Sequence, residues 1–179
     1  MNKLINRTIQ TLAASAFITL AAIGATVANA GEVTVTWQEP AKYTDIRAGE
    51  QNREQFEAAL FKNFDGIFAE LAKKLPDGVH WQVTVTDLDL AGDVMPVGTT
   101  GREMRIVKQN DRPAISFTSK LLDADNKVIN EAQVELKDPN FFSRSAAIIG
   151  KDRKTYPYEE FMINQWFERQ QNSLVFPKK

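Results

Sequence analysis

The spacing of hydrophobic residues changes several times along the chain, and each change predicts an element. Strict alternation of apolar and polar residues, typical of a half-buried strand, begins at residues 31–38 (GEVTVTWQ). The same period returns four more times further along the chain. The five predicted strands are residues 31–38, 80–89, 102–109, 113–122 and 127–137.

Two stretches have the three- and four-residue spacing of an amphipathic helix. In residues 50–75 an apolar stripe runs from Phe56 to Leu71, with acidic residues early and lysines late, as the helix dipole favours. In residues 156–172 a wide apolar face includes Phe161 and Trp166, with Pro157 in the first turn. Two helices are therefore predicted.

The segments between these elements have the composition of turns and loops. Residues 110–112 (NDR) and 123–126 (DADN) are short polar connections of the kind that antiparallel hairpins require. Residues 91–101 (AGDVMPVGTTG) predict an exposed loop. In the next strand, Met104 and Ile106 are expected to point inward.

One predicted strand contains an irregularity. In residues 80–89 the apolar positions change parity before Leu88, which predicts a β-bulge or a sharp twist near Thr86 and Asp87. The element order is strand, helix, four strands, helix. A sheet with one apolar face and two amphipathic helices predicts a two-layer α+β sandwich, with a mainly antiparallel sheet of about five strands and both helices on one face.

The first thirty residues have the layout of a secretory signal peptide. Lys3 and Arg7 precede an uncharged apolar run, residues 12–27, and Ala28-Asn29-Ala30 then forms an A-x-A cleavage site. A membrane anchor is the alternative, but it needs about twenty apolar residues and a basic flank. We expect cleavage before Gly31, one α+β domain over residues 31–179, no membrane span after cleavage, and a periplasmic location.

Composition excludes several kinds of chemistry. The 179 residues include no cysteine and one histidine, so disulfides, thiolate catalysis and cysteine-ligated metals are absent. Lysine and arginine total 22 against 23 aspartates and glutamates, a balance that argues against nucleic-acid binding. Neither a dinucleotide fingerprint nor a Walker motif is present, and no cofactor is expected.

The most distinctive polar segment is residues 86–93 (TDLDLAGD). Asp87 and Asp89 are two residues apart, which on a strand places both carboxylates on one face about 7 Å apart, and Asp93 follows in the loop. These acids are candidate ligands for a hard cation such as calcium or magnesium, although the calcium-loop pattern is missing. A catalytic carboxylate pair is a second interpretation. The simplest is a strand end whose acids accept bonds from backbone amides, Arg102 or Arg105.

Two further features have simple structural explanations. His80 begins a strand and is expected at a surface or an edge. Residues 138–155 form a modestly basic loop that suits anionic lipid headgroups or an acidic partner, or a solvated loop held by two core phenylalanines, Phe141 and Phe142. Its basic residues are Arg144, Lys151, Arg153 and Lys154.

Several strings resemble one family along nearly the whole mature chain. They are VTWQEP (35–40), KYTDIR (42–47), FAELAKKLP (68–76), TDLDLAGD (86–93), LLDADNKV (121–128) and LKD (136–138). This pattern is similar to that of a bacterial domain family of unknown function, DUF3016. The resemblance implies an exported protein of Gram-negative bacteria and supplies no activity and no catalytic residues.

These observations favour a non-catalytic, exported protein that binds a partner: an envelope protein, or a lipid or cell-wall component. This hypothesis predicts an exposed groove or apolar patch at residues 91–101 or 138–155. The alternative is a metal-binding module or metal-dependent enzyme that uses Asp87, Asp89 and Asp93.

Overall fold

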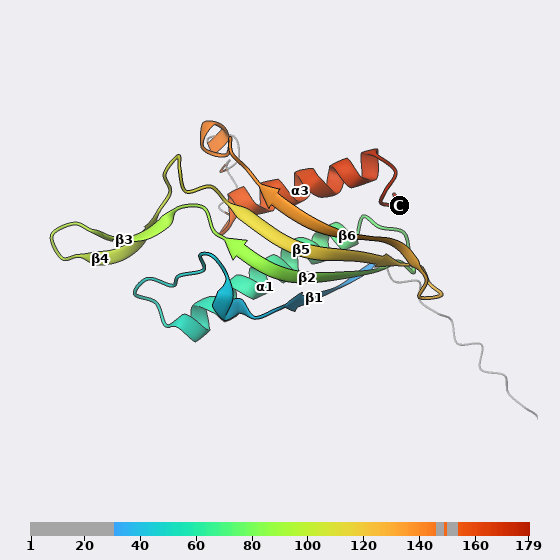
Figure 1. Ribbon diagram of the computed structural model, residues 1–179, viewed down its shortest axis with the longest axis horizontal. Helices are drawn as coiled ribbons and strands as arrows, with labels where there is room; N and C mark the ends of the chain where they lie inside the picture. The colour runs from blue at the N-terminus through green and yellow to red at the C-terminus, as the bar shows by residue number, and fades with distance from the viewer. Residues whose placement is uncertain (1–30, 146–148, 150–153) are drawn as a thin grey trace, which may run out of the picture.

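The computed structural model describes residues 31–145, 149 and 154–179 (Figure 1). The predicted signal peptide and its cleavage residues Ala28 and Ala30 lie outside these ranges, and so do Lys151 and Arg153. Gly31 is the first described residue, and it is buried against Ala72 and Leu75 at the end of the first helix.

A four-stranded sheet forms one layer of the fold, in the order β1-β2-β5-β6. The strands pair antiparallel except for β1, which pairs parallel with β2 because a helix separates the two along the chain. This mainly antiparallel sheet confirms the predicted class. The strands are β1 (Glu32–Trp37), β2 (His80–Asp89), β5 (Ala114–Leu122) and β6 (Val128–Lys137).

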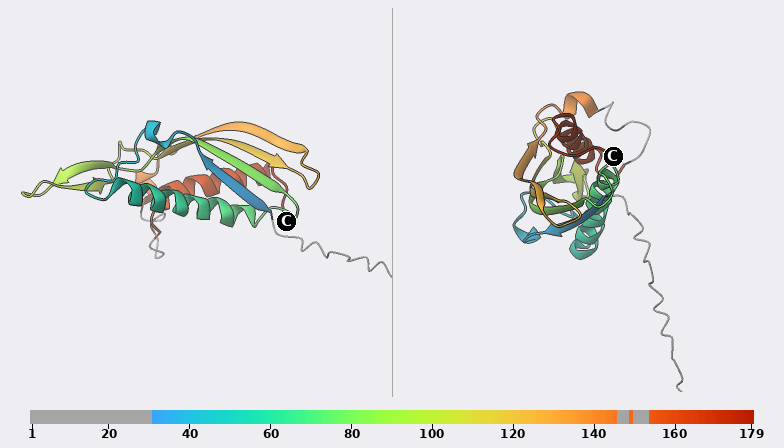
Figure 2. Two further views of the ribbon diagram at one scale, coloured as in Figure 1. Left: turned by 90° about the horizontal axis from the view of Figure 1, so that it is seen from below. Right: turned by 90° about the vertical axis from the view of Figure 1, so that its right-hand side faces the viewer.

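Two helices form the second layer, on one face of the sheet (Figure 2). They are α1 (Arg53–Ala72) and α3 (Pro157–Asn172). Helix α1 begins where the Asn52 side chain accepts a hydrogen bond from the backbone N–H of Gln55. The arrangement confirms that both amphipathic helices cover the apolar side of the sheet.

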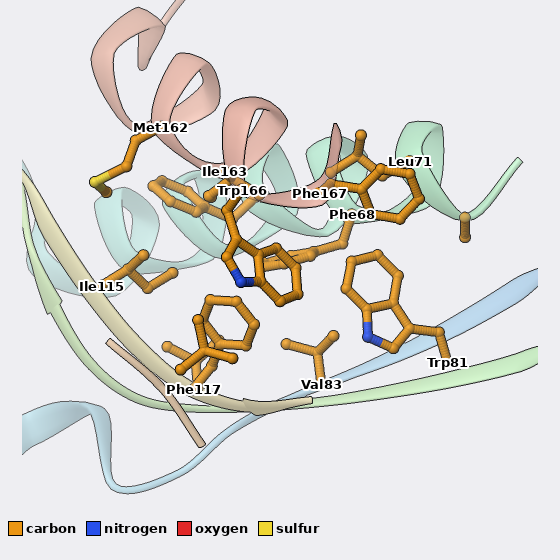
Figure 3. Packing of buried hydrophobic residues seen from close by; sticks show 14 of the residues in the cluster. Phe68, Leu71, Trp81, Val83, Ile115, Phe117, Met162, Ile163, Trp166 and Phe167 are labelled. Carbon is orange, nitrogen blue, oxygen red and sulfur yellow. The ribbon is translucent and has the colours of Figure 1, made fainter. Parts of the chain in front are cut away.

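Aromatic rings fill the space between the two layers (Figure 3). Trp166 of α3 lies over Trp81 of β2 with 6.2 Å between ring centroids, and it meets Phe117 of β5 edge-on at 5.1 Å. Phe68 of α1 contacts both Trp81 and Phe117. The Trp81 indole N–H donates to the buried Ser119 hydroxyl at 2.9 Å, so the one polar atom of that ring is satisfied.

The predicted irregularity in β2 is confirmed. The pairing of β2 with β5 shifts between Val85 and Asp87, so that Val85 opposes Phe117 and Asp87 opposes Ser116. The extra residue turns Leu88 into the core while Asp87 stays on the other face. The parity change in the sequence is therefore a bulge at this point.

The region after β2 differs from the prediction. Residues Asp93–Val97 form a strand, β3, which pairs with β4 (Arg102–Ile106) in a hairpin separate from the four-stranded sheet. Figure 1 shows this hairpin extending beyond the end of the sheet. The main sheet consequently has four strands rather than about five, and residues 91–101 are only partly a loop.

The hairpin extends away from the core between the sheet and the helices (Figure 1), and the inward orientation expected for Met104 is wrong. Its side chain is 52% exposed. Two short 3-10 helices, η1 (Pro40–Lys42) and η2 (Phe142–Arg144), complete the described elements. No helix in the described part of the chain combines the length and the apolarity that a bilayer crossing requires.

Candidate binding site at the end of the sheet

The chain returns to the sheet after β1 at a place that brings distant residues together. η1 interrupts the strand direction, and Asp45 then forms a parallel bridge with Asp89 at the end of β2. The Asp45 N–H donates to the Leu88 carbonyl, and the Leu90 N–H donates to the Asp45 carbonyl, both at 3.1 Å. We call residues 43–51 the return segment. It lies between the sheet end, α1 and the β3–β4 hairpin.

Arg105 of β4 holds the return segment against the hairpin. Its guanidinium donates to both carboxylate oxygens of Asp45, at 3.0 and 3.2 Å, and to the carbonyls of Gly92 at 2.8 Å and Arg47 at 3.2 Å. The side chains of Arg105 and Asp45 are only 21% and 13% exposed. This two-pronged geometry is the strongest form of an arginine–carboxylate pair.

The charge of Asp45 is stabilised by these contacts. Burial alone would raise the pKa of the Asp45 carboxyl, but hydrogen bonds from Arg105 and Arg47 outweigh it and hold this pKa below its ordinary value. Asp45 is therefore an anion at neutral pH and a fixed partner for Arg105.

More exposed charges join the same two segments at their rim. Arg47 pairs with Asp45 at 3.3 Å and with Asp93 at the start of β3. Glu50 accepts from the Arg102 side chain at 3.2 Å and from the Glu103 N–H at 3.3 Å. The side chains of Arg47 and Arg102 are largely exposed, so these contacts contribute less to stability than the Arg105 pair does.

Hollows open on either side of the return segment. One, of about 400 Å³, lies between η1, the start of α1 and the return segment, and Tyr43 and Arg53 line it. A second, of about 310 Å³, lies between the return segment and the hairpin, with Phe56, Met104 and Tyr156 on its walls and Arg47, Arg102 and Arg105 around them. We call the second one the hairpin hollow. It combines aromatic and thioether surface with arginine side chains.

The three predicted acidic residues lie near this region; Asp87 and Asp93 each have a partner of their own, and Asp89 and Asp93 line the same hollow. Asp87 accepts from the N–H of Thr44 at 2.7 Å and from its hydroxyl at 2.8 Å. Asp93 pairs with Arg47. Asp89 lines a third hollow of about 360 Å³ together with Lys137. Burial, followed by repulsion from Asp45, raises the pKa of Asp89.

Within the described ranges, no three acidic or histidine side chains are grouped so that they could hold a metal ion. Asp87 accepts a backbone N–H, as the simple structural interpretation of residues 86–93 expects. Arg105, however, binds Asp45 rather than Asp87 or Asp89.

A buried acid that sequence reasoning missed lies beside the root of the hairpin. Glu159, in the first turn of α3, is only 2% exposed, and its carboxylate accepts from the Ala91 N–H at 2.7 Å. Burial raises the pKa of Glu159, while the hydrogen bond from Ala91 and the charge of Arg105 oppose that rise. In the sequence, only the position of Glu159 in the first helical turn distinguishes it. Acidic residues are favoured there in any helix, so that position does not predict burial.

The remaining candidates have structural roles where they are described. His80 starts β2 opposite Leu122 and is partly exposed. In the basic loop, Arg144 binds the buried Asp138 carboxylate at 2.5 Å. Phe141 is fully buried as predicted, but Phe142 is 42% exposed, so only one of the two phenylalanines belongs to the core.

The fold and site define a two-layer α+β protein with an accessory hairpin held to the return segment by a partly buried arginine, Arg105. The family model described as "Protein of unknown function (DUF3016)" matches residues 31–169, and the chain belongs to this family. Comparisons with curated proteins and with solved structures gave no match.

Proposed function

We propose that the protein is a non-catalytic binding module of the bacterial cell envelope, and that the hairpin hollow and the adjoining face of the hairpin contact its partner. The observation that carries the proposal is the exposed apolar surface at this end: Met104 is 52% exposed and Val97 is 37% exposed. Apolar surface bordered by arginine side chains is typical of contact sites for proteins and amphipathic ligands.

The charged groups here support binding rather than catalysis. The carboxylate of Asp45 is bound in two-pronged fashion by Arg105, and Glu50 accepts from Arg102 and from the hairpin backbone. A general base needs a carboxylate or imidazole that is open to the substrate and has a pKa near the working pH. Asp45 has a lowered pKa and is enclosed by arginines, so it suits a structural role.

Site-directed photo-crosslinking in cells tests this proposal. A photoreactive amino acid is introduced at Met104, and in a separate variant at Gln133, an exposed position on β6. The proposal predicts a discrete adduct, whose partner mass spectrometry identifies, from Met104 and not from Gln133. Equal adducts from both positions, or none from Met104, would contradict it.

We also propose a periplasmic location, which rests on the signal-like pattern of residues 1–30. Osmotic-shock extraction followed by intact-mass measurement tests it. The expected result is a protein in the periplasmic fraction whose mass begins at Gly31. A chain that keeps these residues and stays in the membrane fraction would contradict the proposal.

The alternative of metal binding through Asp87, Asp89 and Asp93 makes a distinct prediction. Calcium, magnesium or manganese would release or absorb heat on titration into the wild-type protein, and the heat would disappear in the Asp87→Asn/Asp89→Asn variant. Because each candidate carboxylate has its own partner or neighbour in the fold, we expect no heat from either protein.

A further inference from the structure

The β3–β4 hairpin holds two methionines that face each other across its strands. Met95 of β3 lies directly opposite Met104 of β4, and residues opposite each other in an antiparallel pair point to the same face. Met104 is 52% exposed and lines the hairpin hollow, whereas Met95 is half-buried. Val97 alternates onto the same face and is 37% exposed. The proposed contact surface therefore has thioether groups at its centre.

The remaining methionines of the chain are in different surroundings. Met162 of α3 is only 6% exposed and packs in the core between the two layers (Figure 3). Met1 lies outside the described residues, in the predicted signal peptide. Since the chain has no cysteine, methionine supplies all of its sulfur. In the described part of the chain, the accessible sulfur atoms are therefore on the hairpin.

Thioether sulfur undergoes one characteristic modification, the transfer of an oxygen atom from a peroxide or a hypohalous acid. With hydrogen peroxide, the sulfur lone pair attacks one oxygen, an S–O bond forms and the O–O bond breaks. The sulfur is oxidised by two electrons, and the second oxygen is reduced and leaves as water with both protons. The product, methionine sulfoxide, is a polar side chain in place of an apolar one.

This change would alter the energetics of the hairpin face. The sulfoxide oxygen is hydrated in the free protein and loses that water when a partner covers the face. Arg102 and Arg105 of the same strand already donate to Glu50 and Asp45, so an apolar partner surface leaves the sulfoxide oxygen of Met104 without a donor. Burying an unpaired polar group of this kind should weaken binding roughly ten- to a hundredfold.

We propose that Met104 is an oxidant-sensitive modification site: a peroxide or a hypohalous acid converts its thioether to the sulfoxide, which weakens partner binding at the hairpin hollow. Met95, which is less exposed, is the slower second target. The effect on binding rests on the proposed function of the hollow. The preferential oxidation of Met104 does not, because it depends only on the exposure of the thioether.

Limited oxidation of the purified protein by hydrogen peroxide, followed by peptide mass spectrometry, tests the modification itself. We expect sulfoxide to form fastest at Met104, more slowly at Met95 and slowest at Met162. The matched control is the same reaction in urea, which exposes all of these thioethers and should bring their rates together. Equal rates at Met104 and Met162 in the folded protein, or a faster rate at Met162, would overturn the proposal.

Photo-crosslinking from Val97 in cells tests the effect on binding, with each protein compared with its own untreated sample. After peroxide treatment we expect most of the adduct to be lost in the wild type and in Met162→Leu. The yield should stay constant in Met95→Leu/Met104→Leu, because leucine keeps a similar apolar volume and cannot form a sulfoxide. An equal fractional loss in that double variant, or no loss in a wild type whose Met104 is oxidised, would overturn the effect on binding.

The two measurements separate this inference from the proposed function. If neither Val97 nor Met104 gives an adduct in untreated cells, the proposed function fails and the effect on binding fails with it. The order of oxidation measured by mass spectrometry then still decides whether Met104 is the modification site.

Discussion

Replacing Arg105 with methionine retains an unbranched apolar side chain. It removes the guanidinium that joins the hairpin to the return segment. Four hydrogen bonds are lost, two of them to the Asp45 carboxylate. Asp45 is then left as a mostly buried anion with only the more exposed Arg47 beside it. We expect this variant to be clearly destabilised and its hairpin to be less well held.

The magnitude follows from how much of the pair is buried. Breaking a fully buried ion pair costs about 3–5 kcal/mol, and an exposed pair contributes about 0–1 kcal/mol. With Arg105 21% exposed and Asp45 13% exposed, a loss of about 2–3 kcal/mol is expected. For a domain of about 150 residues this lowers the melting temperature by roughly 5–10 °C.

Urea unfolding followed by tryptophan fluorescence measures this loss, and Arg102→Met is the matched control on the same strand. The Arg102 side chain is 72% exposed and pairs with Glu50, so its removal should cost less than about 1 kcal/mol. In the double variant Asp45→Asn/Arg105→Met the two effects should be less than additive. Equal costs for the two arginines, or strict additivity with Asp45, would refute the reasoning.

Three further substitutions test other parts of the structure. Gly92→Ala should lower the free energy of unfolding in urea by about 2 kcal/mol or more, because the new Cβ would clash with a β4 carbonyl oxygen. Gly98 also has a positive φ, but no atom lies close to the position of its Cβ, so Gly98→Ala should lower it by about 1 kcal/mol. Trp81→Phe should cost about 2–4 kcal/mol in the same assay, since it opens a gap and leaves the buried Ser119 hydroxyl without its donor. Asp45 contributes stability that is present above its ordinary pKa and lost as the pH falls through its lowered folded value; melting between pH 2 and 5 should therefore show a steeper acid decline in wild type than in Asp45→Asn.

Local periodicity was sufficient for the main sheet and its helices. Helix α1 and strand β5 each bury one face. The apolar stripe of α1 and the alternation of β5 therefore predict which side of the element faces the core. The change in apolar parity before Leu88 also predicted the bulge in β2. These features depend on short-range patterns and on one apolar surface covering another.

The hairpin and the clamp were not predictable in the same way. Strand β3 has five residues and contains Pro96, so its alternation is too short to identify. Alternation in β4 assigned Met104 to the interior, yet that strand lies outside the two-layer core and Arg105, which faces the return segment, is the more enclosed side chain. The pairing of Arg105 with Asp45, sixty residues apart, depends on where the return segment crosses the sheet end. Local sequence does not carry that information.

The most direct test of the binding site measures photo-crosslinking from Met104 in three backgrounds: wild type, Lys120→Met and Arg105→Met, all at a temperature where each is folded. The account predicts a strong adduct in wild type and in Lys120→Met, whose charge pairs with Glu131 away from the hairpin, and a large loss in Arg105→Met, because Arg105 makes the most enclosed of the contacts between the hairpin and the return segment. An adduct of equal yield in all three would contradict the claim that this clamp forms the site.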